Sequence, residues 1–292
     1  MTRLFLGLPA PAKLNLFLHV VGRRGDGYHE LQSAFVPIDL VDTLSFELLD
    51  EARIERRGDI DWPEDADLAV RAARLLQQFA GTTHGVAIDV TKRIPSGSGM
   101  GGGSSDAATT LLALNRLWGL NLARHELQRL GVGLGADVPF FLGPGPAFVE
   151  GIGERLTPLT LQPAWYAVVY PQVTVSTAKV FGQVELTQCT KATTISDFSA
   201  AATPLDDANC PAQKPPYGAN DLEVIVRRQY PQVDAALRYL GNFGNARMTG
   251  SGSAVFARMP GEVQARGAVE QLPNGWQGFV TRSLVEHPLA AW

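Results

Sequence analysis

The sequence is poor in cysteine, in positive charge and in long apolar runs. Its two cysteines, Cys189 and Cys210, form neither a CxxC pair nor a metal-ligand spacing, so we expect two free thiols in a reducing compartment. The net charge of −4 argues against a nucleic-acid-binding protein, which normally carries a basic excess. No apolar run approaches the ~20 residues of a membrane-spanning helix, and the apolar stretch at 4–8 is shorter than the ~7–15 residues of the apolar region within a secretory leader. These absences predict a cytoplasmic protein that binds neither nucleic acid nor membrane.

Periodic apolar residues indicate a mixture of strands and helices. Residues 13–21 alternate as a strand does, which places Lys13, Asn15, Phe17 and His19 on one face. Further strands are expected at 35–38, 44–49, 86–90, 166–170, 246–249, 254–258 and 279–284. Helical spacing predicts helices at 67–79, 107–118, 124–130, 221–229, 233–240 and 263–271.

The domain organisation follows from a change of character near residue 155. The order of elements predicts an α+β protein of two domains, 1–155 and 156–292, and hydrophobic residues at 45% suffice for real cores. The stretch at about 187–218 is polar, rich in Pro, Ala and Thr, and aperiodic. Such a stretch is unusual inside a compact domain, so we expect a surface excursion there.

The strongest functional signal is a glycine-rich segment directly before a predicted helix. Five glycines fall within the seven positions 97–103. Glycine lets backbone N–H groups turn inward, and the helix start adds unpaired donors and a positive dipole end, so the segment suits polyphosphate. A serine at its end can cap the helix or offer a hydroxyl to a ligand. The segment consists of Pro95, Ser96, Gly97, Ser98, Gly99, Met100, Gly101, Gly102, Gly103, Ser104 and Ser105.

Other glycine motifs fit this segment less well. Residues 97–102 satisfy the dinucleotide pattern GxGxxG, but the acidic residue expected about 20 positions later is missing, because Glu126 lies within a predicted helix. The chain contains no Gly-Lys pair for a P-loop, and neither the HRD nor the DFG motif of protein kinases. A flexible glycine turn without a ligand is the remaining structural alternative.

The glycine segment resembles the phosphate-binding motif of the GHMP small-molecule kinases. Further segments resemble one branch of that family, and the Asp-Gly-Tyr-His sequence at 26–29 is the most specific of them. These segments are Pro11–Leu16, Arg24–Leu31, Gly135–Phe141 and Thr249–Ala254. They run in order along nearly the whole chain, and the family places the last of them close to the phosphate loop.

The resemblance implies a kinase, a phosphotransferase with an alcohol group as acceptor, and the two-domain GHMP fold with its active site in the interdomain cleft. The implied ligands are ATP, Mg²⁺ and a cytidine-diphosphate sugar alcohol, whose 2-hydroxyl is phosphorylated on the non-mevalonate route to isoprenoid precursors. Another GHMP kinase with a different alcohol is the alternative, and a nucleotide-binding regulator without catalysis is a third. The protein would be a monomer or a homodimer.

The resemblance also implies roles for single residues. Asp137 matches the family's catalytic aspartate, and Lys13 matches its partner lysine. Without the resemblance, the sequence would indicate an aspartate in a turn and a solvent-exposed lysine on a strand. A lysine keeps a neighbouring carboxylate ionised and stabilises charge on the transferring group. The substrate-binding residues would be Asn15, Tyr28, His29 and Phe181, with the tyrosine and histidine contacting cytosine. Phe181 reads equally well as a core residue on a short helix.

Two acidic residues depart from the family pattern. Asp106 follows the serine pair where the family often has Asn, and we expect it, in the first turn of a helix, to point away from ATP or to help hold Mg²⁺. Asp67 also stands where Asn is frequent, which puts a contact to the adenine edge in doubt. His19 is expected to be a packing or surface residue.

Overall fold

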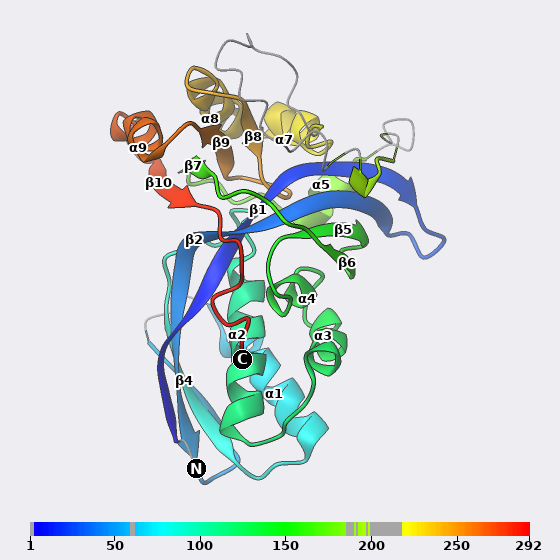
Figure 1. Ribbon diagram of the computed structural model, residues 1–292, viewed down its shortest axis with the longest axis vertical. Helices are drawn as coiled ribbons and strands as arrows, with labels where there is room; N and C mark the ends of the chain where they lie inside the picture. Colours follow the sequence, from blue (N-terminus) through cyan, green and yellow to red (C-terminus); the bar gives the residue numbers. More distant parts are fainter. Residues whose placement is uncertain (1–2, 59–61, 185–189, 191, 197, 199–217) are drawn as a thin grey trace.

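The chain forms two β-sheets that are arranged one above the other along the long axis of the molecule (Figure 1). The structure is a computed structural model, and it describes residues 3–58, 62–184, 190, 192–196, 198 and 218–292. Both cysteines and most of the expected excursion at 187–218 lie outside the described residues. Where that stretch is described, Phe198 is buried against Phe17 and Phe148. A surface excursion is therefore wrong for this residue, because an aromatic ring in a polar stretch still gains free energy from burial.

One long hairpin runs through the first sheet. Its strands are β1 (Leu4–Arg23) and β2 (His29–Leu49), which pair antiparallel over most of their length. The expected strands at 13–21, 35–38 and 44–49 are parts of this hairpin. Prolines interrupt the apolar pattern and conceal its continuity, and one of the register shifts along the pair lies at Pro11.

The other strands of the first sheet flank the hairpin. β4 (Gly85–Thr91) and β5 (Ala147–Gly151) pair antiparallel with different halves of β2. β3 (Ile54–Arg57) pairs parallel with β4, and β6 (Arg155–Pro158) pairs antiparallel with β5. The order is β3-β4-β2-β5-β6, with β1 beside β2.

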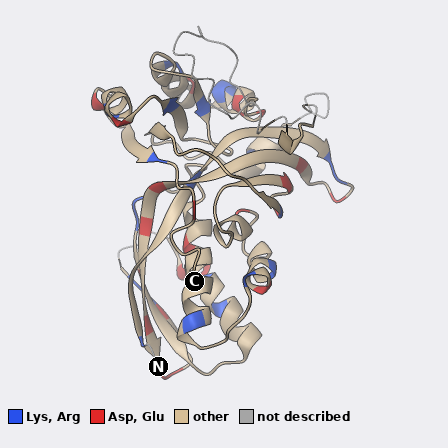
Figure 2. Ribbon diagram, in the orientation of Figure 1, with Lys and Arg blue, Asp and Glu red and all other residues tan. Residues whose placement is uncertain are grey.

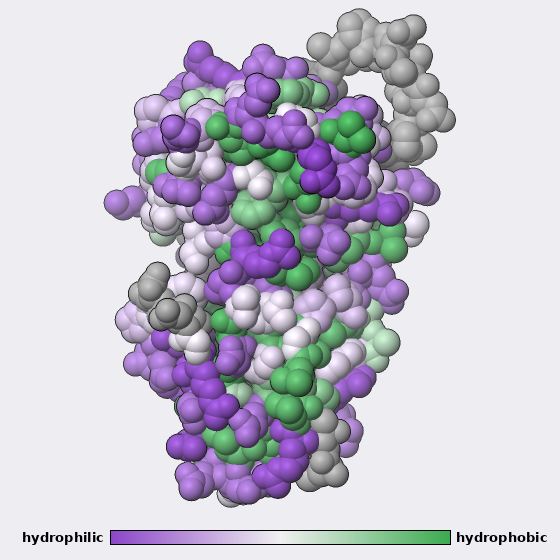
Figure 3. Space-filling model, turned by 90° about the vertical axis from the view of Figure 1, so that its left-hand side faces the viewer, coloured by the Kyte–Doolittle hydropathy of each residue, from purple (hydrophilic) through white to green (hydrophobic). Residues whose placement is uncertain are grey.

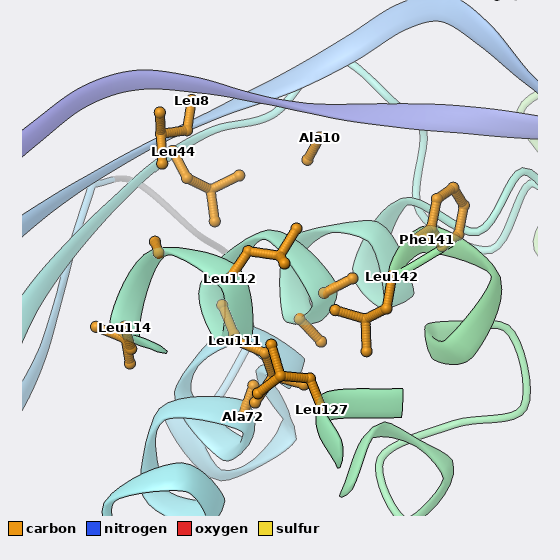
Figure 4. Close-up of a cluster of buried hydrophobic side chains, with 14 of the residues drawn as sticks. Leu8, Ala10, Leu44, Ala72, Leu111, Leu112, Leu114, Leu127, Phe141 and Leu142 are labelled. Carbon is orange, nitrogen blue, oxygen red and sulfur yellow. The ribbon is translucent and has the colours of Figure 1, made fainter. Parts of the chain in front are cut away.

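Helices cover one side of this sheet and bury its apolar face. They are α1 (Leu68–Ala80), α2 (Gly102–Leu117), α3 (Arg124–Val132) and α4 (Val138–Phe141), preceded by a short 3₁₀ turn at Glu64–Ala66. Leu112 of α2 points toward Leu8 and Leu44 of the hairpin, while Leu111 faces Ala72 and Leu127 of the neighbouring helices (Figure 4). This core fixes α2, and with it the glycine-rich segment at its start.

The second sheet is antiparallel and smaller. Its order is β10-β7-β9-β8, and the helices that pack against it are α8 and α9 (Figure 1). The strands are β7 (Trp165–Tyr170), β8 (Ala246–Met248), β9 (Val255–Met259) and β10 (Gln277–Arg282). The helices of this part are α5 (Thr177–Phe181), α7 (Glu223–Gln229), α8 (Pro231–Gly241) and α9 (Glu262–Glu270). The domain boundary near 155 stays a prediction.

After β10 the chain returns to the helices of the first part (Figure 1). Arg124 holds this tail, because its guanidinium donates hydrogen bonds to the carbonyls of Leu289, Ala290 (2.8 Å) and Trp292 (3.0 Å). The Trp292 ring also packs edge-on against Phe5, at 5.0 Å between ring centroids. The tail therefore joins the end of the chain to its beginning.

We expect Arg124→Ala to lower the free energy of unfolding by about 2 kcal/mol, because hydrogen bonds from a charged donor are lost and buried carbonyls remain unpaired. Urea unfolding followed by circular dichroism measures this change. Arg129→Ala on the same helix is the control, since that side chain is exposed and the change should be within ~0.5 kcal/mol. Equal losses in both variants would show that the tail contacts contribute nothing.

The surface is mixed in charge and in polarity. Lys and Arg alternate with Asp and Glu on both parts of the described chain (Figure 2), and hydrophobic residues lie between hydrophilic ones on the face shown in Figure 3. Among the described residues, no helix has the length and apolarity needed to cross a membrane.

Candidate active site

The glycine-rich segment 95–105, which we call the phosphate loop after the family motif that it resembles, leads into α2. Gly97, Gly99 and Gly101 have positive φ values of 66°, 79° and 76°, a backbone region that other residues rarely adopt. Gly101 is the N-cap of α2, which begins at Gly102 and not near 107 as the sequence suggested. Glycine and serine have low helix propensity, so packing and not local preference sets this start. The free N–H groups of the first turn thus lie at the end of the loop.

The segment Thr249–Ala254 packs directly against the phosphate loop. A Cβ atom on Gly99 would lie 2.4 Å from the carbonyl oxygen of Thr249, so only glycine fits there. The backbone N–H of Ala254 donates to the carbonyl of Ser98 at 2.9 Å. The contact implied by the resemblance is therefore confirmed.

Lys13 and Asp137 approach each other beside the loop. The Lys13 Nζ lies 3.4 Å from Asp137 Oδ2 and 4.3 Å from the centroid of the Phe35 ring. Lys13 is 3% exposed, whereas the Asp137 side chain, just before α4, is 29% exposed. Burial lowers the pKa of the Lys13 ammonium, and the Asp137 carboxylate opposes that change. The pair thus combines a buried cation with an accessible carboxylate.

Asn15 connects this pair to the second part of the chain. Its Oδ1 accepts hydrogen bonds from Lys13 Nζ (2.6 Å) and from the Thr249 hydroxyl (3.2 Å), and its Nδ2 donates to the Ser33 hydroxyl (3.0 Å). The amide therefore orients the lysine. Asn15 and Lys13 share a face, as the alternation predicted.

The alternation fails two residues further along β1. Asn15 pairs with Phe35 but Leu18 pairs with Ser33, so β1 holds one extra residue there, a β-bulge. As a result Leu18 lines the cavity, whereas His19 lies buried against Phe17. His19 is a packing residue as expected, but its predicted place on the face of Lys13 is wrong.

These groups line a cavity of about 590 Å³, a size typical of small-molecule sites. Lys13, Asn15, Asp137 and most of the phosphate loop line it, although Met100 and Ser105 are buried behind the loop. A second cavity of about 580 Å³ adjoins it and shares its lining at Leu31, Ala136, Ile152, Thr177 and Phe181. The two cavities form one elongated site.

The second cavity contains the three aromatic residues that the resemblance assigned to substrate. The rings of His29 and Phe181 lie 5.7 Å apart with an interplanar angle of 31°. Tyr28 is 62% exposed at the rim. Burial and the nearby Arg23 lower the pKa of His29, and its Nε2 has no hydrogen-bond partner among the described residues. A neutral imidazole beside an aromatic ring suits a flat, polar-edged ligand.

Asp67 and Asp106, the two acidic residues that depart from the family pattern, both point into the protein. Asp67 is the N-cap of α1 and accepts hydrogen bonds from the backbone of Ala69 and Val70, so its carboxylate does not line the cavity. Because α2 begins early, Asp106 lies in the second helical turn, where it forms an ion pair with Lys92 at 2.5 Å. Of the two expectations for Asp106, the side chain pointing away from the cavity agrees with this geometry.

Asp106 and Lys92 belong to a cluster that also contains the fully buried Asp42. Burial lowers the pKa of Lys92, but the two carboxylates outweigh it, so the pKa is raised. Burial and Asp42 raise the pKa of Asp106 to about 7 in spite of the attraction of Lys92. Two carboxylates thus share one ammonium in this cluster.

Sequence reasoning missed Ser33, Lys92 and Thr177, three polar residues that line the cavity. Lys92 immediately follows a strand and precedes the glycine loop, and a charge at that junction is the signal that could have found it. The hydroxyls of Thr177 and Ser251 are hydrogen-bonded at 2.7 Å and join α5 to the loop at Thr249–Ala254. These two come from segments that meet only in the fold.

Comparison with known proteins identifies the family of the chain. The family described as GHMP kinases N terminal domain matches residues 67–145, and GHMP kinases C terminal matches residues 213–278. A homoserine kinase from Cytophaga hutchinsonii superposes with a TM-score of 0.70 at 17% identity, over 98% of this chain and 96% of that chain, which is a likeness of fold. The chain belongs to the GHMP kinases.

Its most similar relatives include 4-diphosphocytidyl-2-C-methyl-D-erythritol kinases. That of Burkholderia orbicola is 50% identical over 292 residues, which cover 100% of this chain and 98% of the relative. That of Thiobacillus denitrificans is 53% identical over 282 residues, which cover 96% of each chain. A crystal structure of 4-(cytidine 5'-diphospho)-2C-methyl-D-erythritol kinase superposes with a TM-score of 0.81 at 37% identity, over 95% of this chain and 98% of that chain.

Proposed function

We propose that the chain transfers the γ-phosphoryl group of ATP to the 2-hydroxyl of 4-diphosphocytidyl-2-C-methyl-D-erythritol, a step toward isoprenoid precursors. The observation that carries this proposal is the Lys13–Asp137 pair beside the phosphate loop, in a cavity continuous with an aromatic pocket. ATP would lie on the loop, and the cytosine in the aromatic pocket. The acceptor hydroxyl would then lie between them, next to Asp137.

The proposed chemistry follows from the two charged groups. Asp137 accepts the proton of the attacking hydroxyl as the new bond to the γ-phosphorus forms and the bond to ADP breaks. Lys13 keeps that carboxylate ionised, and its charge stabilises the negative charge on the transferring group. The N–H groups of the loop and of the start of α2 hold the remaining phosphates.

Mg²⁺ fits this cavity as a companion of ATP. Mg²⁺ keeps several waters and uses one or two protein oxygens together with substrate phosphates, so a dedicated cage is not needed. Among the described residues, no group of three or more His, Cys, Asp or Glu side chains could hold a metal ion. Ser104, which lines the cavity where the loop passes into α2, is the oxygen donor that we assign to the ion. The ion would neutralise phosphate charge.

The proposal is tested by ADP release from Mg·ATP in the presence of the cytidine-diphosphate acceptor, with homoserine and mevalonate as competing alcohols. We expect turnover with the first acceptor alone. Turnover with homoserine or mevalonate would support another alcohol kinase of the family. Binding of ATP without turnover on any of these alcohols would contradict the proposal.

Phe181→Ala is expected to raise the KM for the acceptor about 10- to 100-fold and to leave the KM for ATP unchanged. The reason is that stacking of a base on an aromatic ring contributes about 1–3 kcal/mol. Steady-state kinetics with each substrate varied in turn measures this split. Phe79→Ala is the control, because that ring is exposed on α1 and lines neither cavity. Equal KM values for the acceptor in wild type and Phe181→Ala would show that the cytosine does not bind in this pocket.

A further inference from the structure

Three segments of the first part of the chain meet at Lys92. Its Nζ donates hydrogen bonds to Oδ2 of Asp42, on β2, and to Oδ2 of Asp106, in the second turn of α2. Lys92 itself follows β4 directly. Asp42 is fully buried and Asp106 is 5% exposed. One ammonium thus joins a strand, a loop and a helix.

These contacts lie at both ends of the phosphate loop. At its start, Asp42 Oδ1 accepts hydrogen bonds from the backbone N–H groups of Arg93 (2.5 Å) and Ile94 (2.8 Å). At its end, a Cβ atom on Gly102 would lie 3.3 Å from Asp42 Oδ2, so the first residue of α2 packs closely on the same carboxylate. The cluster therefore ties the start of the loop to the helix that follows it.

Lys92 also reaches the cavity. An ammonium group has three donors, and two of them are used by the carboxylates. Because Lys92 is among the residues that line the first cavity, we expect its third donor to meet a ligand there.

Stability alone is a poor reason for such a cluster. Removing two carboxylates and an ammonium from water costs several kcal/mol per ion, and apolar replacements of similar size are often equally stable. A role in positioning explains better why charges are held here.

We propose that Asp42 and Asp106 are positioning residues that hold Lys92 and both ends of the phosphate loop in the arrangement that binds ATP. This proposal rests on the proposed function, because it takes ATP to be the nucleotide that is bound. Neither carboxylate lines the cavity, so both act through Lys92 and the loop backbone.

The test measures binding of Mg·ATP by calorimetry without acceptor, together with steady-state kinetics. We expect Asp106→Ala to raise the Kd and KM for ATP about 10- to 100-fold, since a hydrogen bond to a charged group contributes about 1.5–3 kcal/mol. The KM for the acceptor should stay within about twofold. Asp106→Asn should restore ATP binding to within about threefold, because its amide oxygen still accepts from Lys92.

Two further variants separate positioning from folding. The triple variant Asp42→Asn, Lys92→Met and Asp106→Leu removes all three buried charges, and the amide oxygen at position 42 still accepts from the loop backbone, so it should fold and show the same loss of ATP affinity. Arg124→Ala should lose stability and keep the ATP affinity. A folded Asp106→Ala or triple variant that bound ATP like the wild type would overturn the proposal, as would equal increases in the KM values of both substrates. A wild type that bound Mg·ATP but phosphorylated no alcohol would refute the proposed function and still allow this comparison.

Discussion

Replacement of Asp137 by alanine is expected to lower kcat by about 10³- to 10⁴-fold, with the KM for ATP within about threefold of the wild-type value. A positioned general base raises the rate of the chemical step by about 10²–10⁴-fold. Its loss here also leaves the Lys13 ammonium buried without its carboxylate partner. The KM for ATP should not change much, because the phosphate loop and α2 do not depend on this side chain. The measurement is ADP release at saturating concentrations of both substrates.

Asp137→Asn is the matched variant, because it keeps the shape of the side chain and removes its charge. The same loss of kcat in both variants would assign the effect to the carboxylate and not to packing. Calorimetric binding of Mg·ATP to each variant confirms that the site is intact. A loss of less than tenfold in either variant would demote Asp137 to a residue that only orients the acceptor.

Gly99→Ala is expected to abolish ATP binding, with an increase in Kd of more than ~100-fold, and to lower the free energy of unfolding by about 3 kcal/mol. The methyl group would lie 2.4 Å from the Thr249 carbonyl, and the backbone at φ 79° is unfavourable for alanine. The backbone conformation costs about 1–2 kcal/mol and the overpacking about 1–3 kcal/mol. To avoid the clash between the alanine methyl group and the Thr249 carbonyl, the phosphate loop would have to move away from Thr249–Ala254. Urea unfolding and calorimetry measure the two effects.

The matched control is Gly267→Ala, in the interior of α9. A Cβ atom there meets no atom within 4 Å, and φ is not positive. Alanine in a helix interior is favoured over glycine by about 0.5–1 kcal/mol, so this variant should be slightly more stable and fully active. If Gly99→Ala behaved like Gly267→Ala, the close packing of the two loops would have no importance for the nucleotide.

Local chemistry explains which parts of the site could be predicted from the sequence. The phosphate loop and the α1, α2 and α3 helices follow from glycine content and helical spacing, which act over a few neighbouring residues. Lys13 and Asp137 are far apart in the chain, and the family resemblance, not periodicity, brought them together. Their separation of 3.4 Å depends on the fold, which brings a residue of β1 beside the residue that precedes α4.

The features that were missed depend on contacts between distant segments. The β-bulge after Asn15 reverses the faces of the following residues, and no local pattern marks it. The early start of α2 depends on the close approach of Gly102 to Ile94 and Asp42, which compensates for poor helix propensity. The inward direction of Asp106 follows from the same shift, because a helix that begins at Gly102 turns this residue toward Lys92.

The β1–β2 hairpin sets the distance between the two ends of the proposed site. Lys13 lies in the middle of one strand, whereas Tyr28 and His29 lie where the other strand begins. The separation between the base pocket and the point of phosphoryl transfer is therefore fixed by the number of residues in a paired ribbon, not by the angle between the two sheets. Such a site selects its acceptor by length. An alcohol linked to cytidine by a shorter bridge would bind by its base, but its hydroxyl would not reach Asp137.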